Sequence, residues 1–413
     1  MQNMANIRYI RKPSLGSLMA AMVILWLNAG MYSFVQRYIP GIVMYGVFLL
    51  WFVCSFQDKQ YRIEFTSWFI KMIPTIGLLG LMYAINRSSL TKSYLMFFVY
   101  VFMIAAIAIY YQYDSRGRSM ILKVWTLDIV AVVINTYIQI RRNPFVIRNM
   151  SANASVFERL FGGRLYGVAA FSNILCYSVV MLFLYSRIVN KKVKHRTIDV
   201  IGVCVLLLLI FKSQIALLIA FSLAGILLIT LASFFEDLNK LIIFGVISVI
   251  VFGILYKYLP DILKYISTIE TLPELLRVKA SDASLIISGT SNNLEDATLR
   301  MQQYESDIRC FLENPLVGTL GDNTNIGGHS TWIDFLGMYG LLSIVVIIWH
   351  IGLMKNVVKA SAPEERIMVA VIAIVFTAIG IVDPIIFQNV YMVFLLVIPY
   401  MSYPKEEYDG IIM

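Results

Sequence analysis

The stretch GGHSTWIDFLGMYGLLSIVVIIWHIGLM, residues 327–354, passes from a glycine-rich polar loop into a long apolar segment. Its apolar part, residues 332–354, carries one aspartate, Asp334, and one histidine, His350. A helix needs about 20 apolar residues to cross the hydrocarbon core of a bilayer, so this segment is long enough to span a membrane. The same pattern recurs along the chain, which is typical of a polytopic helical membrane protein.

The composition supports this fold class. The chain has 413 residues, of which 59% are hydrophobic and 14% charged, whereas a soluble domain is about half apolar and a quarter charged. We therefore expect an all-α, polytopic membrane protein of about twelve transmembrane helices, forming a single integral membrane domain over residues 1–413. The expected spans are residues 16–35, 39–56, 67–85, 94–113, 121–140, 168–187, 197–211, 214–234, 240–257, 332–354, 366–383 and 386–402. The span 197–211 is short, and the sequence breaks at Lys212-Ser213, so this region could form either one broken helix or a tight helical hairpin.

The charges indicate topology rather than a nucleic-acid partner. The net charge is +9, but in a membrane protein the loop lysines and arginines mark the cytoplasmic side. With the N-terminus inside and its first span retained, the inside segments hold 18 Lys and Arg and the shorter outside loops hold nine. This asymmetry predicts that both termini are cytoplasmic. The four cysteines form no CxxC pair, so the sequence indicates neither a disulfide framework nor a zinc site.

Two expected external segments stand apart from the short loops. Residues 141–167 form a medium loop with five arginines, and residues 258–331 form a large one. Within the large loop, residues 295–313 predict an amphipathic helix, which Asn314-Pro315 should end. A glycine-rich stretch then leads to His329.

Three residues are candidates for catalysis. Arg164 lies among glycines that allow close backbone approach to a ligand, although an arginine at the start of a span can simply reach the interface. Arg300 lies on the loop helix. The alternative to a catalytic role is that Arg300 belongs to an ordinary solvated helix face that includes Asp307. His329 lies where the loop meets a helix, and an imidazole there can transfer protons near neutral pH. Arg309 has no special context and serves as a surface control.

Four further residues are candidates for substrate binding. Tyr304 is one turn after Arg300, and Asp334 is near enough to His329 to orient it. Asn173 lies within a span, where the simpler role is a hydrogen bond to another helix, and Lys212 interrupts an apolar stretch. No metal site and no cofactor is expected, because the external loops contain no Asp-x-Asp motif. The other histidines are interpreted as topological (His195) and as structural or interfacial (His350).

In their order along the chain, these elements resemble the O-antigen ligase/polymerase superfamily over roughly residues 160–345. Arg164, Gly167 and Asn173 are similar to its arginine, glycine and asparagine at the start of a middle span. Arg300 and the stretch from Asn314 to Gly318, NPLVG, are similar to its loop arginine and following motif. His329-Ser330, followed by Gly337 and Gly340, is similar to its histidine element, although Ser330 stands where asparagine is commoner.

The resemblance implies glycosyl transfer from an undecaprenyl-diphosphate-linked oligosaccharide at the outer face of the bacterial cytoplasmic membrane. Arginines would neutralise the diphosphate, in place of a metal ion, and the histidine would handle the acceptor hydroxyl. The leading expectation is a polymerase of O-antigen, capsule or exopolysaccharide repeat units, with membrane lipid, a chain-length regulator and a flippase as partners. A ligase that transfers glycan to a lipid or protein acceptor is the alternative. A polysaccharide flippase or transporter is the alternative from a different class, for which we would expect internal repeats and charges near the bilayer midplane.

Overall fold

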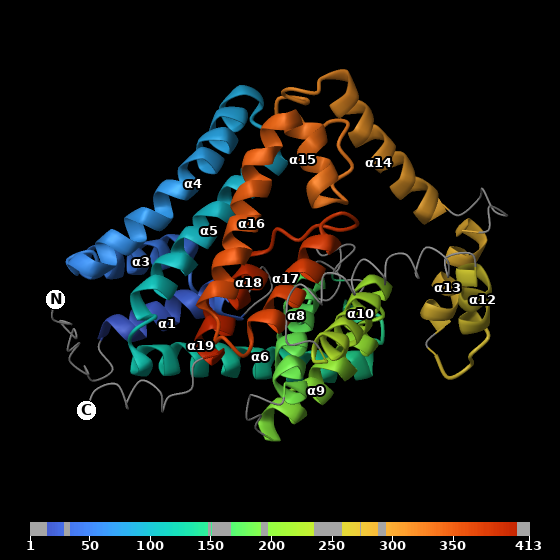
Figure 1. Ribbon diagram of the computed structural model, residues 1–413, viewed down its shortest axis with the longest axis horizontal. Helices are drawn as coiled ribbons and strands as arrows, with labels where there is room; N and C mark the ends of the chain where they lie inside the picture. Colours follow the sequence, from blue (N-terminus) through green and yellow to red (C-terminus); the bar gives the residue numbers. More distant parts are fainter. Residues whose placement is uncertain are drawn as a thin grey trace.

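The structure is a computed structural model that describes residues 15–28, 34–147, 150, 167–190, 197–234, 258–272, 274–287 and 295–402. Within these ranges the chain is helical and contains no strand (Figure 1). In this part of the chain, five helical stretches are long and apolar enough to cross a membrane. They are α4 (Lys59–Asn86), α5 (Ser89–Tyr111), α6 (Ser115–Arg142), α8 (Phe171–Val189) and the run Thr331–Ala360.

Shorter apolar helices complete the bundle. They are α1 (Leu15–Asn28), α3 (Gly41–Ser55), α10 (Ala216–Ala232), α17 (Arg366–Ile379) and the run Gln388–Ser402, which holds α18 (Gln388–Met392), η3 (Val393–Val397) and α19 (Ile398–Ser402). The all-helical class with long apolar helices is thus confirmed. The number of about twelve spans stays a prediction.

Within the described residues the helices overlap the predicted spans, although several helices are longer or shorter than predicted. The first predicted span is too long, because α1 ends at Asn28 and the short α2 (Phe34–Tyr38) begins near the predicted end. The break near Lys212 separates two helices, α9 (Thr197–Ser213) and α10, at Gln214, whose φ is +57°. The predicted span 332–354 is divided at Gly340, as described below. The predicted span 240–257 lies outside the described residues.

Polar side chains define where the long helices begin. The Asp58 carboxylate accepts hydrogen bonds from two backbone N–H groups in the first turn of α4, and Asp114 does the same for α6. The Ser88 hydroxyl accepts from the backbone of Thr91 in α5. Each cap satisfies N–H groups that have no partner within the helix.

The centre of the bundle is α8, which is buried along most of its length and packs against α9, α10, α17 and α18. At one end of the bundle, the α4–α5 connection binds the segment before His329: Asn86 Nδ2 donates to the Leu320 carbonyl at 2.9 Å and Thr91 Oγ1 to that of Gly321 at 3.2 Å. At another, Arg187 of α8 binds Glu365 at 2.8 Å. In each of these two contacts, the charge pattern assigns both of the joined segments to the same side of the membrane.

Candidate functional site

The candidate site is built where the large loop returns to the bundle. The loop contains α12 (Leu259–Ser267) and α13 (Glu274–Ile287), which pack on each other, and α14 (Glu295–Glu313). Helix α14 coincides with the predicted helix 295–313 and ends before Asn314-Pro315, as expected. It runs from the side of the bundle to the top of α15 (Thr331–Tyr339), which lies between α14 and α16 (Ile344–Ala360) (Figure 1).

Glycines let the turn after α14 lie directly on the backbone after His329. Gly318 and Gly340 have φ values of +59° and +56°, a region that favours glycine. A Cβ on Gly340 would lie 2.6 Å from the Pro315 oxygen and the Leu316 carbonyl carbon. The backbone of Leu341 donates to the Pro315 oxygen at 2.8 Å, and that of Thr319 to the Gly337 oxygen at 3.0 Å. The glycines after His329 therefore allow the turn after α14 to pack closely on this backbone.

The same contact explains why the apolar run 332–354 is not one straight helix. Helix α15 ends at Gly340, a short 3₁₀ segment η2 (Gly340–Ser343) follows, and α16 begins at Ile344. The positive φ of Gly340 turns the chain around the Pro315-Leu316 backbone. The short helix α15 is therefore a separate element that carries His329 at its entrance.

His329 is half-buried in a tight turn at the start of α15. Gly328 before it has a φ of +70°, and a Cβ on Gly327 would lie 2.6 Å from the Cβ of Gln303 in α14. Ser330 after it caps α15: its Oγ accepts from the Ile333 backbone at 3.1 Å and donates to the Gly380 oxygen at 3.1 Å. The turn is therefore held against both α14 and the α17–α18 connection.

Two carboxyl groups lie buried beneath this turn. Asp307 of α14 is 0% exposed and Asp334 of α15 is 1% exposed, and the two side chains lie close enough for a hydrogen bond to join them when one carboxyl carries a proton. Burial raises the pKa of Asp307, against the opposing effects of the Gly327 N–H, the Asp334 side chain and His329. A pair of carboxyl groups this close cannot both ionise without strong repulsion.

Asp307 is the residue that the sequence interpretation missed. The alternative interpretation placed it on an ordinary solvated face with Arg300, and its burial excludes that interpretation for Asp307. The available signal was its spacing, since positions 300, 304 and 307 share one face of a helix. An acidic residue on the face that packs inward requires a buried partner, which here is Asp334.

The other expected site residues lie on several elements. Tyr304 donates its hydroxyl to the Val382 oxygen at 2.9 Å, which ties α14 to the α17–α18 connection beside the His329 turn. Asn173 is at the start of α8, where its Oδ1 accepts from the Ala170 backbone at 3.1 Å. Lys212 is exposed in the last turn of α9. Tyr304 and Asp334 thus come together with the His329 turn.

Of the two candidate arginines, the structure describes the backbone of one. The backbone of Arg300 belongs to α14, seven residues before Asp307, which corresponds to about 10 Å along a helix. Arg164 lies outside the described residues. The expected convergence of both arginines with His329 stays a prediction.

His350 has a structural environment. It is 1% exposed, with Nδ1 2.7 Å from the Tyr391 hydroxyl and Nε2 2.9 Å from Thr377 Oγ1. Thr377 Oγ1 donates to the Ala373 oxygen, so it accepts from the His350 Nε2–H, and Tyr391 donates to Nδ1. This arrangement satisfies one tautomer of a neutral imidazole and accords with the structural role expected for His350.

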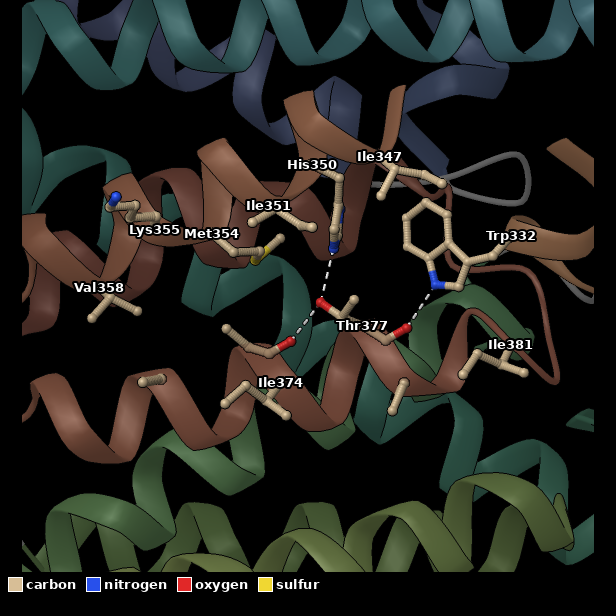
Figure 2. A pocket seen from close by; sticks show the side chains of 13 residues that line it. Trp332, Ile347, His350, Ile351, Met354, Lys355, Val358, Ile374, Thr377 and Ile381 are labelled. Atoms are coloured by element: carbon tan, nitrogen blue, oxygen red, sulfur yellow. Dashed lines mark hydrogen bonds between the residues drawn. The ribbon is translucent and has the colours of Figure 1, made fainter. Parts of the chain in front are cut away.

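An apolar groove runs between α16 and α17 beside this network. It has a volume of about 500 Å³ and is lined mainly by apolar side chains. Figure 2 shows Trp332 of α15 at one end, where its Nε1 donates to the Thr377 oxygen at 2.8 Å, and Lys355 at the other. The groove therefore begins three residues after His329 and follows α16 along the bundle.

Within the described ranges, no three His, Cys, Asp or Glu side chains gather closely enough to hold a metal ion. The chain matches no model of a protein family, and no curated protein is significantly similar to it. Any functional conclusion therefore depends on the residues and geometry of this chain.

Proposed function

We propose that this protein polymerises the repeat units of a bacterial surface polysaccharide by glycosyl transfer from an undecaprenyl-diphosphate-linked donor. The observation that carries the proposal is the packing of three sequence elements from the end of the large loop into one unit. Helix α14, which holds Arg300, the turn from Asn314 to Gly318, and the segment from His329 to Gly340 lie together. They contain two of the three groups of residues through which the sequence resembles the O-antigen ligase/polymerase superfamily.

The chemistry of the candidate residues fits this reaction. When the glycosidic bond to the carrier breaks, negative charge develops on the leaving diphosphate. An arginine supplies a permanent charge and a planar pair of donors for phosphate oxygens, which is the role proposed for Arg300 and Arg164. His329 takes the proton of the acceptor hydroxyl as that oxygen attacks the sugar.

The apolar groove supports a lipid-linked donor. Such a substrate has a polar head, which needs the His329 region, and a long hydrocarbon chain, which needs an apolar surface. The groove between α16 and α17 begins at Trp332, next to that region. In this proposal the chain has about twelve spans, cytoplasmic termini and a site at the outer face of the bacterial cytoplasmic membrane.

Alanine variants tested by complementation of a strain that lacks the gene would decide the proposal. We expect His329→Ala, Arg300→Ala and Arg164→Ala each to abolish long glycan chains on a gel while the protein stays in the membrane. Loss of one charge-stabilising donor reduces turnover by about 10²–10³, and Arg300→Lys should restore only part of it, because an ammonium cannot make the bidentate contact. The matched control is Arg309→Ala, an exposed arginine on the same helix, which should be nearly silent.

The products distinguish the proposal from its alternatives. A variant that leaves single repeat units on the final acceptor indicates a polymerase. Lipid-linked polymer that is never transferred indicates a ligase. Donor that accumulates only at the cytoplasmic face indicates a flippase, and normal long chains from both His329→Ala and Arg300→Ala would refute the proposed mechanism.

A further inference from the structure

The turn that carries His329 is held on both sides by the buried carboxyl pair. Before the histidine, the Gly327 N–H donates to Asp307 Oδ1 at 2.8 Å. After the histidine, the Ser330 N–H donates to Asp334 Oδ2 at 3.3 Å. The backbone around His329 is therefore fixed by one carboxyl from α14 and one from α15.

The other oxygen of each carboxyl receives no hydrogen bond from the described part of the chain. Asp307 Oδ2 and Asp334 Oδ1 are buried, and no N–H or O–H group of the described residues donates to either. A buried oxygen without a donor is destabilising, and an ionised carboxylate cannot donate. One proton shared by the two carboxyls would supply the missing donor, as it does in other close carboxyl pairs.

We propose that Asp307 and Asp334 share one proton and act as positioning residues for His329, so that the geometry of the site depends on that proton. With the shared proton, the pair holds α14 on α15 and fixes the His329 turn. Without it, two adjacent carboxylates repel each other, and the two anchors of the turn separate. This inference rests on the proposed function for the chemical role of His329.

The groups around the pair favour this assignment. From the loop, His329 is close enough to interact electrostatically with Asp307. From α5, the Tyr94 phenol faces both carboxyls, with Tyr339 of α15 beside it, and Cys310 follows Asp307 by one turn on α14. Arg309 and Glu305 on α14 are exposed. Among these described neighbours His329 is the group that can carry a positive charge next to the pair, so the two should titrate in a linked way.

The chain is suited to a direct test, because it has three histidines, of which His329 is one. Protein labelled with ¹⁵N-histidine in detergent can be titrated by NMR, with the His329 signal assigned from His329→Ala. We expect the chemical shift of wild-type His329 to change in two steps with pH. One step is the titration of His329 itself, and the second inflection occurs when the shared proton leaves the carboxyl pair. Asp307→Asn should lose the second inflection, because the amide donates permanently to the Asp334 carboxylate.

The matched control is Glu305→Gln, which removes an exposed carboxylate from the same helix and should behave as the wild type. Persistence of the second inflection in Asp307→Asn, or its absence in the wild type, would overturn the shared proton. Misplacing a catalytic group by about 1 Å can lower a rate about 10²-fold, so Asp307→Ala should reduce long glycan chains to that extent, with partial activity in Asp307→Asn.

The two proposals fail in different ways. Normal chains from Asp307→Ala, together with none from His329→Ala, would refute the positioning role and leave the proposed function intact. Normal chains from His329→Ala would refute the proposed function, while the His329 titration would still report whether the pair shares a proton.

Discussion

Replacing Gly340 by alanine tests whether the backbone contact between the two halves of the site is as close as the structure shows. A Cβ at this position would lie 2.6 Å from three backbone atoms of residues 315–317. Ordinary van der Waals contact begins at 3.4 Å, so the turn must move by about 0.8 Å, and backbone atoms cannot rotate away as a side chain does.

The expected destabilisation has two parts. Holding alanine at a φ of +56° costs about 1–3 kcal/mol. Overpacking against backbone costs about another 1–3 kcal/mol, which together is a large fraction of the roughly 5–15 kcal/mol that stabilises a folded protein. Because the displaced turn is continuous with α14, the Asp307–Asp334 contact should shift with it, and polymer length should fall.

The assay compares Gly340→Ala with Gly352→Ala. Gly352 lies within α16, and a Cβ there would have nothing within 4 Å, so alanine should be neutral or stabilise the helix by about 0.5–1 kcal/mol. Thermal denaturation of both purified variants, followed by size-exclusion chromatography, gives the comparison. Equal denaturation midpoints for the two variants would show that the Pro315–Gly340 contact is not as described.

Three other predictions follow from separate features. Arg187→Ala should destabilise the protein by about 3–5 kcal/mol, because it leaves the buried Glu365 carboxylate without its partner; a denaturation midpoint equal to that of Arg309→Ala would contradict this. The raised pKa of Asp307 means that its contribution to stability is fully present below its ordinary pKa of about 3.9 and is lost as the pH rises through the raised value. The denaturation midpoint should therefore fall with rising pH, less steeply in Asp307→Asn; an equal slope in both would count against it. A cysteine introduced at Thr290 should react with an impermeant thiol reagent on intact cells, and labelling only after lysis would reverse the predicted orientation.

The sequence by itself determined the local structure. The apolar segments became helices because their length and composition leave few other ways to satisfy the backbone in a bilayer. Their starts were readable in part from polar residues such as Asp58 and Asp114, which cap the helix through neighbouring residues. The amphipathic helix 295–313 and its end before Pro315 were predicted for the same reason, since periodicity and proline act within a few residues.

The tertiary structure alone decided which of these residues meet. Asp307 has the same spacing in the sequence whether its helix face is solvated or buried, and only the packing of α15 on α14 joins it to Asp334. Likewise the run 332–354 reads as one apolar span, because hydrophobicity does not record backbone direction. Its break at Gly340 follows from contact with a turn more than 20 residues earlier in the chain, and that contact exists only once both segments are folded against each other.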